Sequence, residues 1–246
     1  MAGLSTWQTP LYGVADLNRI SQKTQLRRTS RYDWDRRKGR DRILSWLEPL
    51  VEPWLPHPLY ERRTGLTLGI VSRMTPIKQF PVLFSYLAPV LARFPQVNLE
   101  IFGSGGYGSV RDLTHVLKPI ADRTRFWGHQ SDVASVYQCI DYLLTGLPEK
   151  EALGLNIIEA QACGTPVIGV DAPPFTETVL DGQTGFLYRD PREDNGRDFA
   201  RLMHKLTTHD EKLYPCFAKE HMQKFSFDAF VERLAPIVKW AEGQLS

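Results

Sequence analysis

The most constraining feature of the sequence is a regular alternation of short apolar runs and helical patterns that begins at residue 66. Six runs have the length of buried strands: 66–72, 97–102, 124–127, 142–145, 167–170 and 185–188. Helices are expected at 80–94, 110–121 and 132–139, after Gly154, near 198–206 and at 228–241. Apolar strands that alternate with helices are typical of a parallel sheet covered on both faces. The predicted fold class is therefore α/β, with ligands expected beyond the carboxyl ends of the strands.

A second feature is a pair of carboxylates, Glu151 and Glu159, that bracket a predicted junction between a loop and a helix. Gly154 permits a tight turn there, and a Gly-Thr-Pro sequence further on ends the helix before the next strand. Glu151 is expected in the loop, and Glu159 about one turn inside the helix. Three backbone amides at the helix start are expected to be unpaired: those of Leu155, Asn156 and Ile157. Such amides favour an anion such as phosphate.

The pattern Glu-x7-Glu followed by Ala-x-Ala-Cys-Gly-Thr-Pro-Val-Ile resembles the donor site of retaining GT-B glycosyltransferases, especially those of glycosyltransferase family 4. The resemblance covers about residues 66–189. It implies a Rossmann-like, doubly wound domain that forms the C-terminal, donor-binding half of a GT-B architecture. It also implies that Glu151 orients the donor sugar and that Glu159 holds the ribose hydroxyls. A solvent-facing position on the helix is the alternative for Glu159.

Two cations, Arg73 and Lys78, follow the first strand, where the family has an Arg and a Lys that hold the donor diphosphate. The resemblance implies that they act with the amides of Leu155 and Asn156 on the leaving nucleoside diphosphate, without a metal or another cofactor. An ordinary surface charge is the alternative for each cation. The sequence departs from the family at Gln79, which stands where the family has glycine.

The residues from Gly103 to Gly108 spell Gly-x-Gly-x-x-Gly, which is also the fingerprint of dinucleotide-binding domains. Here the motif follows the second predicted strand, and the next strand ends without the acidic residue that binds an adenosine ribose. The resemblance implies a glycine-rich turn close to the donor, with Gly103 and Gly105 as donor-binding candidates. A plain strand-to-helix turn is the alternative. The loop of residues 127–130 is expected, by the same resemblance, to border the nucleotide base.

The N-terminal segment differs in character from the rest of the chain. Residues 1–64 contain 12 Lys and Arg against 7 Asp and Glu, although the whole chain has a net charge of only +2. Asp33 and Asp35 have the spacing of a metal-binding Asp-x-Asp motif, but the arginines around them favour a solvated charged loop, so no metal site is predicted. We expect a division into residues 1–64, a basic segment with a Pro-rich linker that is a remnant or truncated acceptor side, and residues 65–246, the donor-binding domain.

The resemblance thus implies a hexosyltransferase that moves a hexose from a nucleotide-diphosphate sugar to a sugar, lipid or glycan acceptor, with retention of anomeric configuration. A noncatalytic nucleotide-sugar binding module, or a donor subunit that needs a separate acceptor subunit, remain alternatives. No nucleic acid partner is expected. Three scattered cysteines and no apolar run of about 20 residues suggest a cytoplasmic protein, with peripheral contact to a membrane left open.

Overall fold

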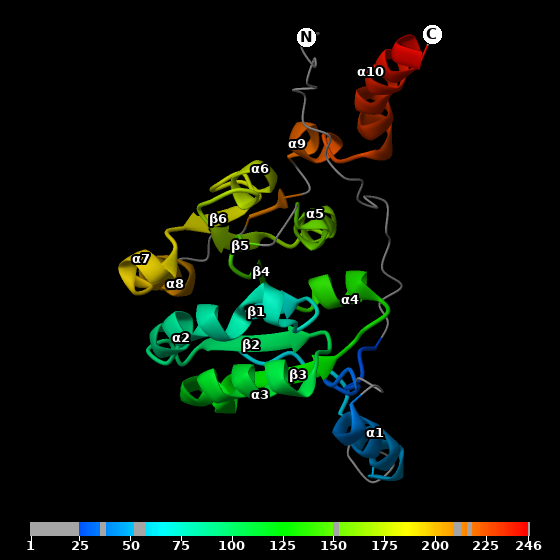
Figure 1. Cartoon of the computed structure of the whole chain (residues 1–246). Helices are drawn as coiled ribbons and strands as arrows, with labels where there is room; N and C mark the ends of the chain where they lie inside the picture. Colours follow the sequence, from blue (N-terminus) through cyan, green and yellow to red (C-terminus); the bar gives the residue numbers. More distant parts are fainter. Residues whose placement is uncertain are drawn as a thin grey trace.

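A computed structural model describes residues 25–34, 38–51, 58–149, 153–208, 213–215 and 218–245 (Figure 1). Its centre is a six-stranded parallel sheet with the order β3-β2-β1-β4-β5-β6. The strands are β1 (Leu66–Val71), β2 (Val97–Phe102), β3 (Thr124–Gly128), β4 (Tyr142–Leu144), β5 (Val167–Val170) and β6 (Gly185–Tyr188). From β1 the chain builds the sheet outwards to β3, then returns to β4 and builds in the other direction. This order confirms the predicted Rossmann-like, doubly wound α/β fold.

Helices cover both faces of the sheet (Figure 1). On one face, α2 (Phe80–Leu91) packs against α3 (Tyr107–Val116), α7 (Pro191–Asp194) and α8 (Arg197–Thr208). On the other, α5 (Leu155–Ala162) packs against α4 (Val133–Gln138) and α9 (Lys219–Gln223). The remaining α-helices are α1 (Gly39–Val51), α6 (Phe175–Thr178) and α10 (Phe227–Leu245). Among the described residues, no helix is both long and apolar enough to cross a membrane.

Three predicted helices have an end that is wrong by three residues or more. Those predicted at 80–94 and 228–241 end at Leu91 and Leu245. The helix expected at 110–121 begins earlier, at Tyr107, and ends at Val116, where a 3-10 helix, Lys118–Arg123, replaces it. Pro119 explains the change, because it has no amide hydrogen for the helical ladder and its ring disfavours a continuing α-helix. Helix α1 includes Pro49 and ends at Val51. The three shortest helices, α6, α7 and α9, were not predicted.

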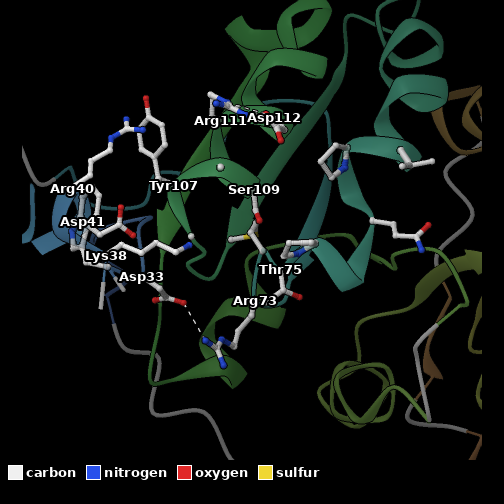
Figure 2. A pocket seen from close by; sticks show the side chains of 18 residues that line it. Asp33, Lys38, Arg40, Asp41, Arg73, Thr75, Tyr107, Ser109, Arg111 and Asp112 are labelled. Carbon is white, nitrogen blue, oxygen red and sulfur yellow. Dashed lines mark hydrogen bonds and ion pairs between the residues drawn. The ribbon is translucent and has the colours of Figure 1, made fainter. Parts of the chain in front are cut away.

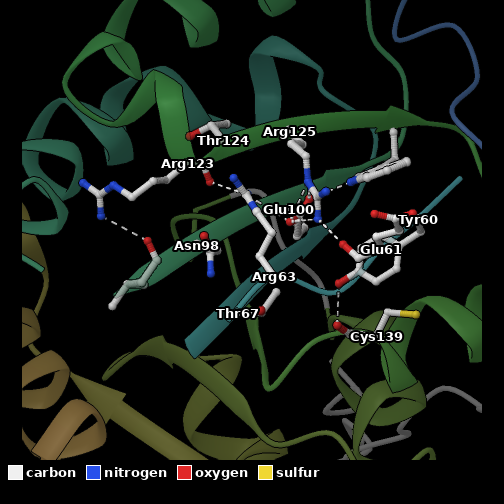
Figure 3. Close-up of polar contacts among 12 residues, drawn as sticks. Tyr60, Glu61, Arg63, Thr67, Asn98, Glu100, Arg123, Thr124, Arg125 and Cys139 are labelled. Atoms are coloured by element: carbon white, nitrogen blue, oxygen red, sulfur yellow. Dashed lines mark hydrogen bonds and ion pairs between the residues drawn. The ribbon is translucent and has the colours of Figure 1, made fainter. Parts of the chain in front are cut away.

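A buried charge cluster fixes the start of the domain to strands β2 and β3 (Figure 3). Glu100 on β2 has no exposed surface. Its carboxylate accepts hydrogen bonds from Arg125 Nη2 at 2.6 Å, Trp127 Nε1 at 2.6 Å and Arg63 Nη2 at 3.0 Å. Because Arg63 lies three residues before the start of β1, the cluster joins the entering chain to β2 and β3. It also orients Trp127, the first residue of the loop 127–130 that is expected to border the nucleotide base.

Residues 25–34, here called the N-terminal strap, cross the carboxyl ends of β3 and β2. The amide of Thr29 donates to the carbonyl of Trp127 at 2.9 Å, and the amide of Gly105 donates to the carbonyl of Arg31 at 3.0 Å. The amide of Asp33 in turn donates to the carbonyl of Gly105 at 2.8 Å. The strap therefore packs on the predicted donor-binding domain, and the division at residue 64 stays a prediction.

Candidate functional site

The candidate site lies where the connections of β1 and β4 leave the sheet in opposite directions. Ligands of open α/β sheets bind at such a switch point, outside the carboxyl ends of the strands. A narrow hollow opens there, and its lining includes Ser72, Lys78, Thr145, Gly146 and Asn156. The turn after β1 and the start of α5 thus meet at the edge of the sheet where the sequence predicted a donor site.

The N-terminus of α5 depends on Gly154, which has φ of +72° and ψ of 63°. A Cβ atom at this position would lie 2.7 Å from Cδ1 of Ile157, so a side chain would be both strained and crowded. The amide of Ile157 donates to the carbonyl of Gly154 at 2.8 Å. The prediction of three unpaired amides is therefore wrong for Ile157. Those of Leu155 and Asn156 make no hydrogen bond among the described residues, and they remain candidates for binding an anion.

Asn156 also ties α5 to the sheet. Its side-chain amide donates from Nδ2 to the carbonyl of Val71 at 3.1 Å. Val71 is the last residue of β1, so this bond fixes the start of α5 beside the turn that carries Lys78. No local sequence pattern indicates this contact beyond the position of Asn156.

Of the two predicted carboxylates, Glu159 lies within the described residues. Glu159 is half-buried on α5, and its Oε2 accepts a hydrogen bond from the hydroxyl of the buried Tyr137 on α4 at 3.3 Å. This bond orients the carboxylate from a neighbouring helix. Glu151 lies outside the described residues, so its position in the site stays a prediction.

Part of the loop that precedes Glu151 is anchored by α7. The guanidinium of Arg192 forms ion pairs with Asp190 and with Glu149. Hydrogen bonds from the Arg192 side chain lower the pKa of the Asp190 carboxyl, which favours its charged form. Sequence reasoning missed this anchor, because nothing local in the sequence relates Glu149 to Arg192.

The two predicted diphosphate cations line different hollows. Lys78, in a 3-10 turn at Pro76–Lys78, lines the hollow at the switch point. Arg73 lines a separate cavity of about 1030 Å³ that lies between α1, α3 and the turn after β1 (Figure 2). Its Nη2 lies 3.4 Å from Oδ2 of Asp33. The structure therefore places both cations at the expected edge of the sheet but does not bring them into one pocket.

Asp33 lies in the segment for which the sequence predicted a solvated charged loop, and its side chain is 40% exposed. Its Oδ1 accepts a hydrogen bond from the hydroxyl of Ser104 at 2.6 Å, and its Oδ2 faces Arg73. Asp35, the other half of the Asp-x-Asp pattern, lies outside the described residues. Within the described ranges, no group of three or more His, Cys, Asp or Glu side chains is arranged to hold a metal ion.

The glycine-rich turn after β2 is explained first by close packing. A Cβ atom on Gly103 would lie 2.0 Å from the carbonyl oxygen of Ser72, and one on Gly105 would lie 2.2 Å from that of Met74. Both amides already donate to carbonyls of the protein, those of Gly128 and Arg31. The glycines let the turns after β1 and β2 approach each other. Their role in donor binding stays a prediction.

The loop expected to border the base is contacted by the strap. The hydroxyl of Thr29 donates to the carbonyls of Trp127 and His129, at 3.1 and 2.9 Å. The side-chain amide of Gln130 donates to the carbonyl of Arg27 at 2.8 Å. Thr29 therefore engages backbone acceptors of this loop, and the Gln130 side chain of the loop donates to Arg27, a connection that no local sequence pattern indicates.

These features define a Rossmann-like α/β domain whose switch point holds Lys78 and a helix start that is a candidate for binding an anion. Residues 65–209 match the family model described as "Glycosyl transferases group 1", and the chain belongs to this family.

Among curated proteins, the chain is similar to D-inositol 3-phosphate glycosyltransferase of Rhodococcus erythropolis, with 33% identity over 176 residues, 66% of this chain and 38% of the relative. It is also similar to phosphatidyl-myo-inositol mannosyltransferase of Mycolicibacterium smegmatis, with 29% identity over 188 residues, 74% of this chain and 46% of the relative. The chain thus spans less than half the length of these relatives.

Solved structures of other proteins share the fold of this chain. Anabaena Alr3699/HepE in complex with UDP and glucose superposes with a TM-score of 0.59 at 20% identity, covering 79% of this chain and 52% of that one. The pneumococcal O-GlcNAc transferase GtfA in complex with UDP and GlcNAc gives 0.57 at 20% identity, covering 81% and 43%. At these identities the likeness concerns the fold alone.

Proposed function

We propose that this chain is the donor-binding half of a retaining glycosyltransferase that uses a nucleotide-diphosphate sugar. The observation that carries the proposal is the meeting of Lys78 with the start of α5 at the switch point of the sheet. Amides at a helix start and a lysine on the facing turn favour a diphosphate. The solved structures with UDP and a sugar, of HepE and GtfA, support this class of ligand.

In this proposal each group has one task. Lys78, Arg73 and the amides of Leu155 and Asn156 stabilise the charge that develops on the leaving nucleoside diphosphate. Glu159, held by Tyr137, accepts hydrogen bonds from the ribose hydroxyls. Glu151 orients the hexose and supports positive charge at its anomeric carbon. The reaction is metal-independent in this account, since the protein cations and amides supply the countercharge.

The acceptor, which is a sugar, a lipid or a glycan, is expected to bind to a domain or subunit other than the donor domain. Residues 65–209 carry the family match, and the chain spans only 38% of the length of the Rhodococcus relative. A separate acceptor subunit is one source of the surface that binds the acceptor. A relative from Streptococcus parasanguinis is named as a GtfA subunit, and a solved structure similar to this chain is that of a GtfA/B complex.

A thermal-shift screen of UDP-, GDP- and ADP-glucose, with and without EDTA, tests the donor proposal. A ligand present at 100 times its dissociation constant is expected to stabilise the chain by about 2.7 kcal/mol. If none of the three raises the melting temperature, the donor proposal is wrong. For a nucleotide sugar that binds, turnover by the isolated chain would indicate a compact enzyme. Binding without turnover, even with candidate acceptor proteins, would indicate a noncatalytic module.

A further inference from the structure

The strap places a fixed carboxylate against one of the proposed diphosphate cations. The backbone amide of Asp33 donates to the carbonyl of Gly105 at 2.8 Å, and its Oδ1 accepts from Ser104 at 2.6 Å. Its other oxygen, Oδ2, lies 3.4 Å from Nη2 of Arg73 (Figure 2). The Asp33 side chain is thus held at its backbone and at one oxygen, whereas the partner that it faces is 75% exposed.

Arg73 is turned toward the strap in this arrangement. Figure 2 shows its guanidinium directed at Asp33, on the cavity side of the turn after β1. Lys78, on the same turn, lines the hollow beside Asn156 instead. A guanidinium binds a carboxylate and a diphosphate through the same N–H groups, so the two anions compete for it.

We propose that Asp33 is the counter-ion of Arg73 in the donor-free chain and that the diphosphate of the donor takes Arg73 from it. The inference rests on the proposed function, because it assumes that Arg73 binds the diphosphate. Asp33 does not touch the donor in this account. It is a positioning residue that acts through Arg73.

The geometry determines which partner moves. Ser104 and the backbone of Gly105 hold Asp33 in place, while the long and exposed side chain of Arg73 can rotate away at little cost. After transfer, the fixed carboxylate recaptures Arg73 as the nucleoside diphosphate leaves. Asp33 therefore lowers the affinity for the product and speeds its release.

The same cavity offers a matched control. Asp112 also lines it, but its carboxylate pairs with Arg111, Nη2 to Oδ1 at 2.7 Å, and makes no recorded contact with Arg73. Asp112→Asn removes the same charge as Asp33→Asn from the same cavity. A difference between the two variants then reports the contact with Arg73 and not the general potential of the surface.

The test is calorimetry of the full chain with UDP, GDP and ADP and with the matching nucleosides. For the diphosphate that binds, Asp33→Asn is expected to increase affinity about twofold to fivefold at low salt, with slower dissociation and less effect at 1 M salt. Nucleoside affinity should not change. The gain should be absent when Arg73→Ala is already present, and Asp112→Asn should change affinity by less than about twofold.

Two results would overturn the inference. One is an Asp33→Asn chain that binds the diphosphate no better than wild type while Arg73→Ala weakens binding. The other is a gain that persists in the Arg73→Ala background. If Asp33→Asn does not fold, Ser104→Ala loosens the same carboxylate and should raise affinity about twofold. Failure of the proposed function looks different: either no diphosphate binds, or Arg73→Ala leaves binding unchanged.

Discussion

Replacement of Glu100 by Gln should destabilise the domain more than the same substitution at an exposed glutamate. Glu100 is fully buried and accepts from three donor side chains, with its shortest contacts at 2.6 Å to Arg125 and Trp127. Gln keeps the size but replaces one acceptor oxygen with an NH₂ group that faces guanidinium donors. The change leaves the positive charge of Arg63 and Arg125 without its buried partner.

The expected magnitude follows from burial. Removing one partner of a buried ion pair costs about 3–5 kcal/mol. The side chains of Arg63 and Arg125 are each 26% exposed, so they regain some hydration and the lower end of that range, about 3 kcal/mol, is expected. Domains have a total stability of roughly 5–15 kcal/mol, so the loss would be easy to resolve.

Urea unfolding followed by circular dichroism measures the effect. Glu193→Gln is the matched control, because its side chain on α7 is 70% exposed and lies 4.0 Å from its partner, Arg189. That control should lose no more than about 0.5 kcal/mol. A Glu100→Gln chain that loses less than about 1 kcal/mol with an unchanged urea dependence would refute the view that the cluster is a buried clamp.

Three further predictions concern the site and the C-terminal region. Glu159→Gln should weaken the binding of nucleoside diphosphate and of nucleotide sugar alike, by about 1–3 kcal/mol. Glu151→Gln should weaken only the binding of the nucleotide sugar. Calorimetry decides this, and equal losses of free diphosphate in both variants would show that the placement of the sugar is wrong. Burial lowers the pKa of His221, so its contribution to stability should be complete above about pH 6.5 and be lost as the pH falls below that value. His221→Gln should flatten the pH dependence of urea unfolding between about pH 5 and 6.5, and an unchanged profile would speak against this role. Diphosphate binding should survive EDTA, and a strict need for magnesium or manganese would make Asp33 and Asp35 metal-ligand candidates again.

The strands could be predicted from the sequence because they are buried on both faces and therefore appear as unbroken apolar runs. All six lie within one residue of their predicted ends. The start of α5 was equally readable, since Gly154 adopts the left-handed conformation that a tight turn requires. Gln79 has φ of +52°, which explains why the family has glycine there.

The contacts that complete the site could not be read from the sequence. Asp33 meets Arg73, and Arg192 meets Glu149, only because the fold brings distant segments together. Glu100 did carry a signal, since a carboxylate inside an apolar strand run must find buried partners. A carboxylate in an apolar strand run indicates that buried hydrogen-bond donors are required, but it does not identify which residues supply them.

The most direct test of the donor site is calorimetry with a nucleoside diphosphate and its nucleoside. Arg73→Ala and Lys78→Ala should each weaken binding of the diphosphate by about 1.5–3 kcal/mol, because a charge-assisted contact to phosphate is lost. Binding of the nucleoside should not change. Lys118→Ala, an exposed cation away from the switch point, serves as the control. Equal losses for diphosphate and nucleoside, or no loss for either ligand, would contradict a diphosphate site at this edge of the sheet.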